Sequence, residues 1–203
     1  MFNIKIAVAL FGLGCLFSNV ANAELFGSSE KKSRNINLFP KWVKMLERLQ
    51  EDEDYCIRSK TCLVEDMVTH IKKKSINYKR YEVLAEVNSL VNRFKYVDDY
   101  TKWKKDDHWS TPTEFFKGGG DCEDYAIAKF KLLKKLGFKN ENMRVVVLSD
   151  TFNNIKHSVL VVFIDEKKYL LDNDISRVIE TKEISHYKPI FSINETHWWK
   201  HSI

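Results

Sequence analysis

The sequence is poor in glycine and proline and contains no hydrophobic run of membrane-spanning length. Only 7 glycines and 3 prolines occur among 203 residues, which excludes collagen-like repeats and long flexible linkers. The apolar run at residues 6–17 is shorter than the ~20 residues that a transmembrane helix needs, so a polytopic membrane protein is excluded. With 44% hydrophobic residues the chain can fold around a core. A net charge of +5 does not by itself indicate a nucleic-acid partner.

Residues 1–23 have the organisation of a secretory signal peptide. Lys5 supplies the positive charge, an apolar region follows, and residues 21–23 (Ala-Asn-Ala) form a small-x-small cleavage site. We therefore predict an exported mature chain, residues 24–203, that forms a single domain. An uncleaved anchor and a lipoprotein signal ending at Cys15 are the alternatives.

Export leaves Cys56, Cys62 and Cys122 in the mature chain. In an oxidising compartment this odd number leaves one thiol unpaired. Cys56 and Cys62 are close in sequence, and we expect a disulfide between them, with two free thiols as the alternative. In either case Cys122 stands alone.

Apolar residues recur at helical spacing in the first part of the chain and in short strand-like runs afterwards. Helical patterns cover residues 42–49, 63–73, 79–96 and 122–136. Short β-branched or apolar runs at 145–148, 159–164 and 169–171 predict strands. Residues 24–37 are polar and predict a mobile start. Helices followed by strands indicate an α+β fold.

The residues around Cys122 indicate a nucleophile. Three glycines at 118–120 allow a sharp turn into a helix, where Asp121 can be the N-cap and Cys122 lies in the first turn. Backbone N–H groups at this end favour a thiolate and can stabilise an oxyanion. A buried structural cysteine is the alternative, but apolar residues such as Tyr125 and Phe130 already supply the core-facing side of this helix.

A thiolate nucleophile needs a base and a group that orients the base. His157 precedes one predicted strand, and Asp172 ends the next. If residues 165–166 form a two-residue turn, Val159 lies opposite Asp172, and His157 lies on the same face ~7–8 Å away. A longer loop or a bulge is equally open because Asp-Glu suits such a turn poorly. Taken alone, His157 would be a solvated strand-edge histidine.

Acidic residues flank Cys122. Asp121, Glu123 and Asp124 would raise the pKa of the thiol. They suit a helix N-terminus without any ligand, but three hard oxygen ligands also suit calcium. We assign all three as provisional metal ligands, although adjacent helical residues point in different directions and not all need bind. Asp106 and Asp107 are more distant candidates.

Three other features have simpler explanations. His197 and His201 have a zinc-compatible spacing, but no third ligand is evident and we expect surface histidines. The lysines at 72–74 indicate a solvated helix face. Trp103 and Trp109 could line a substrate groove or assist the oxyanion site, and core packing is at least as good an interpretation.

The blocks that carry these residues resemble a known family. GGGDCEDYAIAKFKLLKKLGF, KHSVLVV and YLLDN resemble the bacterial transglutaminase-like cysteine proteinases of the LapG type, and the resemblance covers about residues 85–199. It implies Cys122 as nucleophile, His157 as general base and Asp172 as orienting carboxylate. The implied fold is papain/transglutaminase-like, with N-terminal helices and a nucleophile helix packed on an antiparallel β-sheet. The resemblance also favours calcium at the acidic residues beside the cysteine.

The resemblance further implies a periplasmic, calcium-dependent cysteine endopeptidase. Its substrate would be the N-terminal region of a large surface adhesin, cut near paired alanines to release cells from a biofilm. Its regulator would be the periplasmic domain of an inner-membrane cyclic-di-GMP receptor, and neither nucleic acid nor stable membrane insertion is expected. A transglutaminase-like acyl transferase with the same three residues is the alternative enzyme. A non-catalytic periplasmic binding module is the alternative without catalysis.

Overall fold

The computed structural model describes residues 24–59 and 62–203. The predicted signal peptide and Cys15 lie outside the described residues. The helices are α1 (Pro40–Ser59), α2 (Leu63–Lys74), α3 (Arg80–Val91), α4 (Asp99–Trp103), α5 (Pro112–Gly118) and α6 (Cys122–Lys135), with short 3-10 turns at Ile36–Leu38, Asn140–Asn142 and Thr181–Glu183. The strands are β1 (Ser29–Ser33), β2 (Met143–Asp150), β3 (Ile155–Ile164), β4 (Lys167–Leu171), β5 (Ile179–Glu180), β6 (Tyr187–Ile193) and β7 (Trp198–Ser202). Within the described residues, no helix has the length and apolar character needed to cross a membrane.

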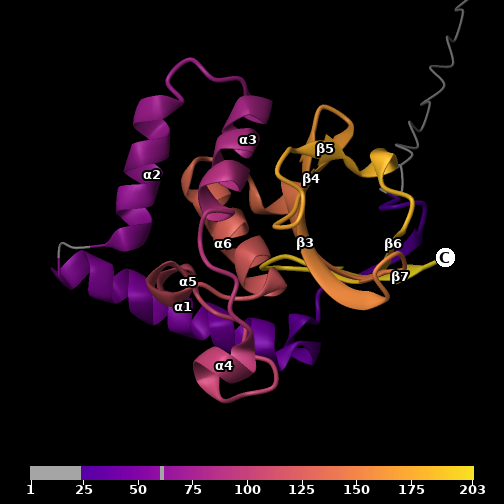
Figure 1. Ribbon diagram of the computed structural model, residues 1–203, viewed down its shortest axis with the longest axis horizontal. Coiled ribbons are helices and arrows are strands. Elements are labelled where there is room, and N and C mark those ends of the chain that lie inside the picture. Colours follow the sequence, from indigo (N-terminus) through magenta and orange to yellow (C-terminus); the bar gives the residue numbers. More distant parts are fainter. Residues whose placement is uncertain (1–23, 60–61) are drawn as a thin grey trace, which may run out of the picture.

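The strands form one antiparallel sheet with the helices gathered beside it. The sheet has seven strands in the order β1-β7-β6-β2-β3-β4-β5. Figure 1 shows the helices on one side and the curved sheet on the other. Because helices α1 to α6 follow one another between β1 and β2 and pack on an antiparallel sheet, the predicted α+β class is confirmed.

Helix α6 lies in the centre of the molecule. It packs on β2 and β3 on one side and on α2, α3 and α5 on the other. Every residue from Glu123 to Leu133 is therefore buried, including residues outside the apolar stripe expected from the sequence. In β3, Leu160 belongs to the helix-facing core cluster, whereas Val161 belongs to the cluster on the opposite face. Burial on both faces explains why the β3 sequence is a continuous apolar run.

The connection between β3 and β4 is a two-residue turn. Ile164 pairs with Lys167 and Leu160 with Leu171, which is the register expected for a turn at residues 165–166. Both turn residues have positive φ, 47° for Asp165 and 64° for Glu166, as a type I′ turn requires. The apolar residues of the paired strands fix this register in spite of the unfavourable turn sequence.

The expectation of a mobile start at residues 24–37 is wrong. Leu25 is fully buried, and β1 pairs with β7 at the edge of the sheet. His201 is also buried, between the hydroxyls of Ser28 and Ser192 at 2.8 and 2.9 Å, so it is not a surface histidine. The short, mixed polar sequences of β1, β6 and β7 give little strand signal, and their pairing partners lie far away in the chain.

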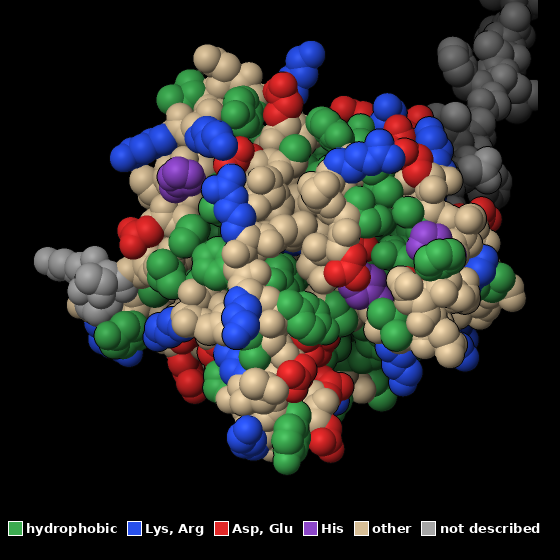
Figure 2. Space-filling model, in the orientation of Figure 1, with side chains coloured by type: hydrophobic (Ala, Val, Ile, Leu, Met, Phe, Trp, Pro, Cys, Tyr) green, Lys and Arg blue, Asp and Glu red, His purple; other side chains and the backbone are tan. Residues whose placement is uncertain are grey.

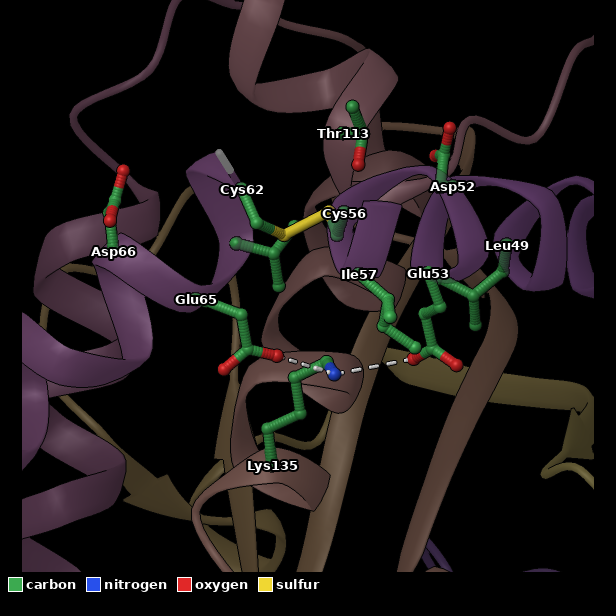
Figure 3. Close-up of a pocket in the computed structure, with 11 residues that line it drawn as sticks. Leu49, Asp52, Glu53, Cys56, Ile57, Cys62, Glu65, Asp66, Thr113 and Lys135 are labelled. Atoms are coloured by element: carbon green, nitrogen blue, oxygen red, sulfur yellow. Dashed lines mark hydrogen bonds and ion pairs between the residues drawn. A yellow bond between two sulfur atoms is a disulfide. The ribbon is translucent and has the colours of Figure 1, made fainter. Parts of the chain in front are cut away.

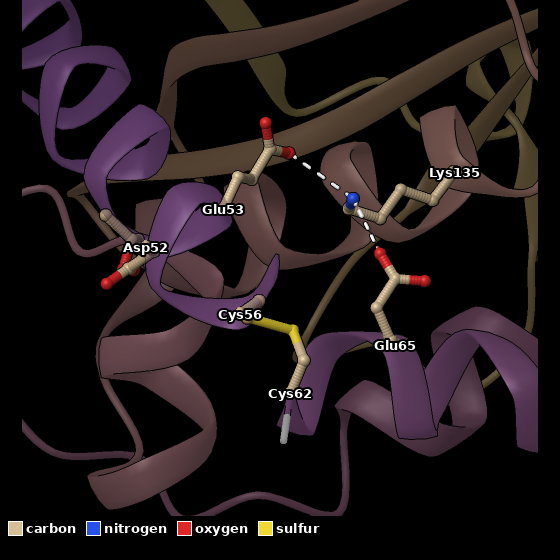
Figure 4. The surroundings of a disulfide bond; sticks show 7 residues. Asp52, Glu53, Cys56, Cys62, Glu65 and Lys135 are labelled. Carbon is tan, nitrogen blue, oxygen red and sulfur yellow. Dashed lines mark hydrogen bonds and ion pairs between the residues drawn. A yellow bond between two sulfur atoms is a disulfide. The ribbon is translucent and has the colours of Figure 1, made fainter. Parts of the chain in front are cut away.

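A disulfide joins α1 to α2. Cys56 and Cys62 are bonded, as expected. Beside them Lys135 of α6 contacts Glu53 of α1 at 3.3 Å and Glu65 of α2 at 2.8 Å (Figure 4). A pocket of about 400 Å³ next to the disulfide is lined by residues of α1, α2, α5 and α6 (Figure 3). None of the predicted site residues lines it, so the disulfide ties helices together rather than serving the cysteine chemistry.

Replacing both Cys56 and Cys62 with serine is expected to lower the free energy of unfolding by about 2 kcal/mol. The disulfide closes a short loop and so reduces the entropy of the unfolded chain. Urea unfolding of the mature protein, with and without the two substitutions, measures the difference. The native protein in reductant is the control and should behave like the variant. An unchanged unfolding midpoint in both would contradict a stabilising disulfide.

Candidate active site

A glycine loop sets the start of α6. Gly119 has φ of +75°, and a Cβ at this position would lie 2.0 Å from the Lys95 carbonyl oxygen, so only glycine fits. The loop is held by a bridge in which the Gly120 N–H donates to the Lys95 carbonyl oxygen at 3.3 Å and the Gly120 carbonyl oxygen accepts from the Val97 N–H at 3.0 Å. Asp121 occupies the N-cap position as predicted, but its side chain makes no capping hydrogen bond and belongs instead to an acidic cluster.

The Cys122 thiol is free and half-buried at the first position of α6. Its Sγ donates to Glu123 Oε2 at 3.3 Å. Burial, followed by the charges of Glu123 and Asp121, raises the pKa of the thiol, and a contact with the Ser158 side chain only partly opposes this. Burial and the acidic neighbours thus act in the opposite direction to the helix end, which alone would lower the pKa of the thiol.

His157 and Asp172 form a buried pair at one end of the sheet. His157 is the third residue of β3, and Asp172 follows the last residue of β4. His157 Nε2 lies 2.8 Å from Asp172 Oδ1, which also accepts from Asp174 N–H at 3.0 Å. The Tyr187 hydroxyl donates to Asp172 Oδ2 at 2.8 Å. Three donors on two oxygens fix the carboxylate, and the carboxylate fixes the imidazole.

The pair is electrostatically coupled. Burial lowers the pKa of His157, but its hydrogen bond and charge interaction with Asp172, aided by Asp174 and Asp150, bring that pKa above its ordinary value. Burial raises the pKa of Asp172, and the contacts with His157, Asp174 and Tyr187 more than offset this, so it falls below its ordinary value. The carboxylate thus orients the imidazole and stabilises the imidazolium that forms once His157 has accepted a proton, which is the role of the acid beside a general base.

Cys122 borders the same region as this pair. Helix α6 packs on β3, and the Ser158 side chain that contacts the thiol follows His157 directly. Burial raises the pKa of the Tyr96 phenol, which lies next to the glycine loop, and the charges of Cys122 and Asp174 both raise it further. Asp174 in turn lies 4.0 Å from His157. In this structure the thiol hydrogen-bonds Glu123 rather than His157. Catalytic contacts commonly tighten only when substrate binds.

Five carboxylates converge beside Cys122. Oxygens of Asp99, Asp121 and Asp124 lie within 4.8 Å of one another, as do those of Asp99, Asp107 and Glu123. In the space-filling view, acidic side chains gather around α4 (Figure 2). Burial and neighbouring carboxylates raise the pKa of Asp121 and Glu123, and raise that of Asp124 to about 8. The cluster therefore holds more negative charge than its surroundings compensate.

The carboxylates of the cluster differ in the hydrogen-bond donors that their oxygens have. Asp124 is held by Ser110, whose N–H and hydroxyl donate to its two oxygens at 2.6 and 2.8 Å. Asp99 Oδ1 and Asp121 Oδ1 are buried and have no hydrogen-bond partner among the described residues. Buried oxygens without a donor are a strong reason to expect a cation. Asp106 belongs to neither group of converging carboxylates, so the structure does not support it as a metal ligand.

Sequence reasoning missed Asp99 and Tyr187. Asp99 lies on the short helix α4, within a segment that showed no regular pattern, and the acid pair at residues 98–99 was its only signal. Tyr187 begins β6, a strand that the sequence did not predict. Trp109 is buried edge-on against Trp42 with ring centroids 6.0 Å apart, so it packs in the core beside the acidic segment.

Comparisons with known proteins point to one family and one solved fold. The family model described as bacterial transglutaminase-like cysteine proteinase BTLCP matches residues 51–201. Solved LapG of Legionella pneumophila is 27% identical, covering 75% of this chain and 87% of that one, with a TM-score of 0.58. Its calcium-bound form is 28% identical, covering 76% and 86%, with a TM-score of 0.59, and its EGTA-treated form is 27% identical, covering 75% and 84%, with a TM-score of 0.59.

No curated protein sequence matches the chain. The family model spans well over half of the sequence and includes the glycine loop, α6 and the β3–β4 hairpin. The structural likeness to LapG extends over most of both chains. The chain therefore belongs to the bacterial transglutaminase-like cysteine proteinases and is a cysteine peptidase with their α+β fold.

Proposed function

We propose that this protein is a periplasmic, calcium-dependent endopeptidase in which Cys122, His157 and Asp172 act as a triad. The observation that carries the proposal is the buried His157–Asp172 pair, 2.8 Å apart, together with a free cysteine at the start of α6, the helix that packs on the strand carrying His157. A nucleophile, a base and a group that orients the base are the components of covalent peptide hydrolysis.

In the proposed reaction His157 takes the proton of Cys122, and the thiolate attacks the carbonyl carbon of the substrate. Backbone N–H groups at the start of α6 stabilise the oxyanion. The imidazolium then donates its proton to the leaving amine as the C–N bond breaks, which leaves a thioester on Cys122. His157 next removes a proton from a water molecule, which attacks the thioester carbonyl. The C–S bond then breaks, the carboxylic acid product leaves, and the His157 imidazolium returns its proton to the Cys122 sulfur. Throughout, Asp172 holds the tautomer and orientation of the imidazole.

Calcium is the proposed occupant of the acidic cluster. Asp99, Asp121 and Glu123, with Asp107 and Asp124, would hold it, since hard carboxylate oxygens are its preferred ligands. When bound, the ion supplies positive charge that offsets the carboxylates now raising the pKa of the neighbouring thiol. The proposal is supported by the unpartnered oxygens of Asp99 and Asp121 and by the existence of calcium-bound and EGTA-treated forms of the LapG of Legionella pneumophila.

The proposed substrate is the N-terminal region of a large surface adhesin, whose cleavage would control attachment in a biofilm. The proposed regulator is the periplasmic domain of an inner-membrane cyclic-di-GMP receptor. Both follow from the LapG-type sequence blocks around Cys122, His157 and Asp172, and the export signal predicted at residues 1–23 supports the periplasmic location.

The test uses mature protein, residues 24–203, and the N-terminal region of a candidate adhesin from the same genome. Intact mass follows cleavage in calcium, then in chelator, then with calcium restored. We expect one defined cut that is lost on chelation and recovered with calcium. Cleavage that survives chelation would remove calcium from the proposal, and no cleavage together with amine incorporation into the adhesin would indicate acyl transfer instead.

A further inference from the structure

Tyr187 holds the oxygen of Asp172 that His157 does not contact. The Tyr187 hydroxyl donates to Asp172 Oδ2 at 2.8 Å, whereas His157 Nε2 and the Asp174 N–H both donate to Oδ1. Asp172 is 1% exposed and Tyr187 is 3% exposed. A charged oxygen at this depth needs a donor, and among the described residues the Tyr187 hydroxyl is the donor that Oδ2 has.

The contact between His157 and Asp172 determines which ring nitrogen can act as the base. Because Nε2 lies 2.8 Å from an ionised carboxylate, which only accepts hydrogen bonds, Nε2 carries a proton and donates it. In the neutral imidazole Nδ1 is then the nitrogen that accepts a proton. With Oδ2 held by Tyr187, the carboxylate cannot rotate away from Nε2 without leaving a buried charged oxygen unpaired.

Aromatic rings surround Tyr187 and restrict its movement. The centroid of its ring lies 5.9 Å from that of His157, 4.8 Å from that of His186 and 6.0 Å from that of Phe26. All three pairs are edge-to-face, an arrangement that aromatic rings favour. The ring therefore has little freedom, and the position of its hydroxyl relative to Asp172 is set by packing.

The N-terminal segment, residues 24–28, is anchored beside Tyr187. Leu25 is fully buried in the same core cluster as Tyr187. The Glu24 carbonyl accepts from Nζ of Lys168 in β4, the strand that leads to the catalytic carboxylate, at 2.5 Å. This segment precedes the part of the chain that matches the family model, so its contact with Tyr187 is an addition to the site that the family match does not include.

We propose that Tyr187 is a positioning residue of the Cys122–His157–Asp172 site, and that the N-terminal segment holds it in place through Phe26. The inference rests on the proposed function. Tyr187 fixes Oδ2 of Asp172, and Oδ1 of the same carboxylate holds Nε2 of His157. Nδ1 is thereby kept as the nitrogen that takes the thiol proton. Tyr187 does not touch the reacting atoms and acts through Asp172.

The test is Tyr187→Phe, which removes the hydroxyl and keeps the ring. The pKa of His157 is measured by proton NMR with calcium present, in a Cys122→Ala background, with the signal assigned through His157→Gln. A carboxylate with one donor fewer attracts the imidazolium more strongly, so we expect the pKa of His157 to rise by about half a unit or more. Asp174 and Asp150, the other charges that raise this pKa, are left in place.

With Cys122 present, Tyr187→Phe should lower kcat by about tenfold, because a hydrogen bond to a charged group that orients the base is lost. KM should stay within about twofold, since Tyr187 is buried and does not reach substrate. A folded Tyr187→Phe protein in which the pKa of His157 does not move would overturn the proposal.

Tyr81→Phe is the matched control. The Tyr81 hydroxyl donates to the Val178 carbonyl at 3.0 Å, and its ring packs on that of Tyr169 at 5.2 Å between centroids. The substitution removes the same atom and one hydrogen bond without touching the catalytic carboxylate. It should leave the pKa of His157 and kcat unchanged. An equal rise of the His157 pKa in both variants would contradict a specific role for Tyr187.

Phe26→Ala tests the N-terminal segment and does not depend on the folding of Tyr187→Phe. Phe26 is half-buried, and its loss should loosen the Tyr187 ring and raise the pKa of His157 by a smaller amount. In the Tyr187→Phe background the same substitution should add nothing, because the hydroxyl through which it acts is gone. An unchanged pKa in Phe26→Ala, or equal shifts in both backgrounds, would contradict the assigned role of the segment.

The NMR measurements use no adhesin. If the proposed proteolysis fails, they still decide whether Tyr187 acts on the His157–Asp172 pair. If cleavage is observed and the pKa of His157 is the same in native protein and Tyr187→Phe, only this inference fails.

Discussion

Cys122→Ala is expected to abolish cleavage of the adhesin fragment, with a loss of roughly 10⁴-fold or more in kcat/KM, about 5.5 kcal/mol of transition-state stabilisation. The only other cysteines in residues 24–203, Cys56 and Cys62, are joined in the disulfide, so no second thiol of this region can replace the nucleophile. The half-buried side chain becomes smaller without leaving a buried charge, and the melting temperature should stay within a few degrees. Initial rates by intact mass and a thermal melt measure the two quantities.

Histidine substitutions provide the matched comparison for the same prediction. His157→Gln should lose activity to a similar degree, because no other group takes the thiol proton. His186→Gln is the control, since His186 lies 3.9 Å from an Asp150 oxygen and packs on the Tyr187 ring at 4.8 Å between centroids. It should retain most of the activity. Similar losses in both variants, or an active Cys122→Ala protein, would contradict the assigned triad.

Removal of calcium is expected to abolish cleavage, and Asp99→Asn is expected to weaken calcium binding by about tenfold or more, roughly 1.4 kcal/mol. Asp99 is 3% exposed, belongs to both groups of converging carboxylates, and has a buried oxygen without a partner. Asparagine keeps an acceptor for the His108 N–H, which hydrogen-bonds Asp99, and removes only the negative charge. Calorimetric calcium titration and the calcium dependence of cleavage give the two affinities.

Asp106→Asn is the control for the calcium prediction. Asp106 neighbours Asp107 in sequence but lies in neither group of converging carboxylates. Its neutralisation changes net charge by the same amount as Asp99→Asn and should leave calcium affinity within about twofold. Equal weakening by the two substitutions would mean that the cluster attracts calcium only through general charge, without Asp99 as a ligand.

The parts of the site that depend on neighbouring residues could be predicted from the sequence. The glycines before Cys122 set a turn into a helix, because Gly119 must adopt positive φ against the Lys95 carbonyl. The β3–β4 hairpin is equally local. Once its turn has two residues, pairing of apolar strands fixes the register, and His157 lies diagonally from Asp172 on the same face of the sheet.

Other members of the site depend on packing between distant segments, for which a local pattern gives no signal. Tyr187 reaches Asp172 because β6 pairs with β2, and the weak strand pattern of β6 concealed this. Asp99 approaches Asp121 and Glu123 because the segment carrying α4 folds against the start of α6. The edge strand β1 forms only through its pairing with β7 at the far end of the chain.

By itself the sequence indicated a turn into a helix at Cys122, two neighbouring strands that carry His157 and Asp172, and the α+β class, since each follows from short-range backbone geometry and apolar periodicity. The tertiary structure decided the charges around them. It adds Asp99 to the acidic cluster, retains Asp107 but not Asp106 of the more distant candidates, and directs the Cys122 thiol to Glu123. Charge effects of this kind depend on burial and on distances between segments, which exist only once α6 is enclosed between the sheet and the helices.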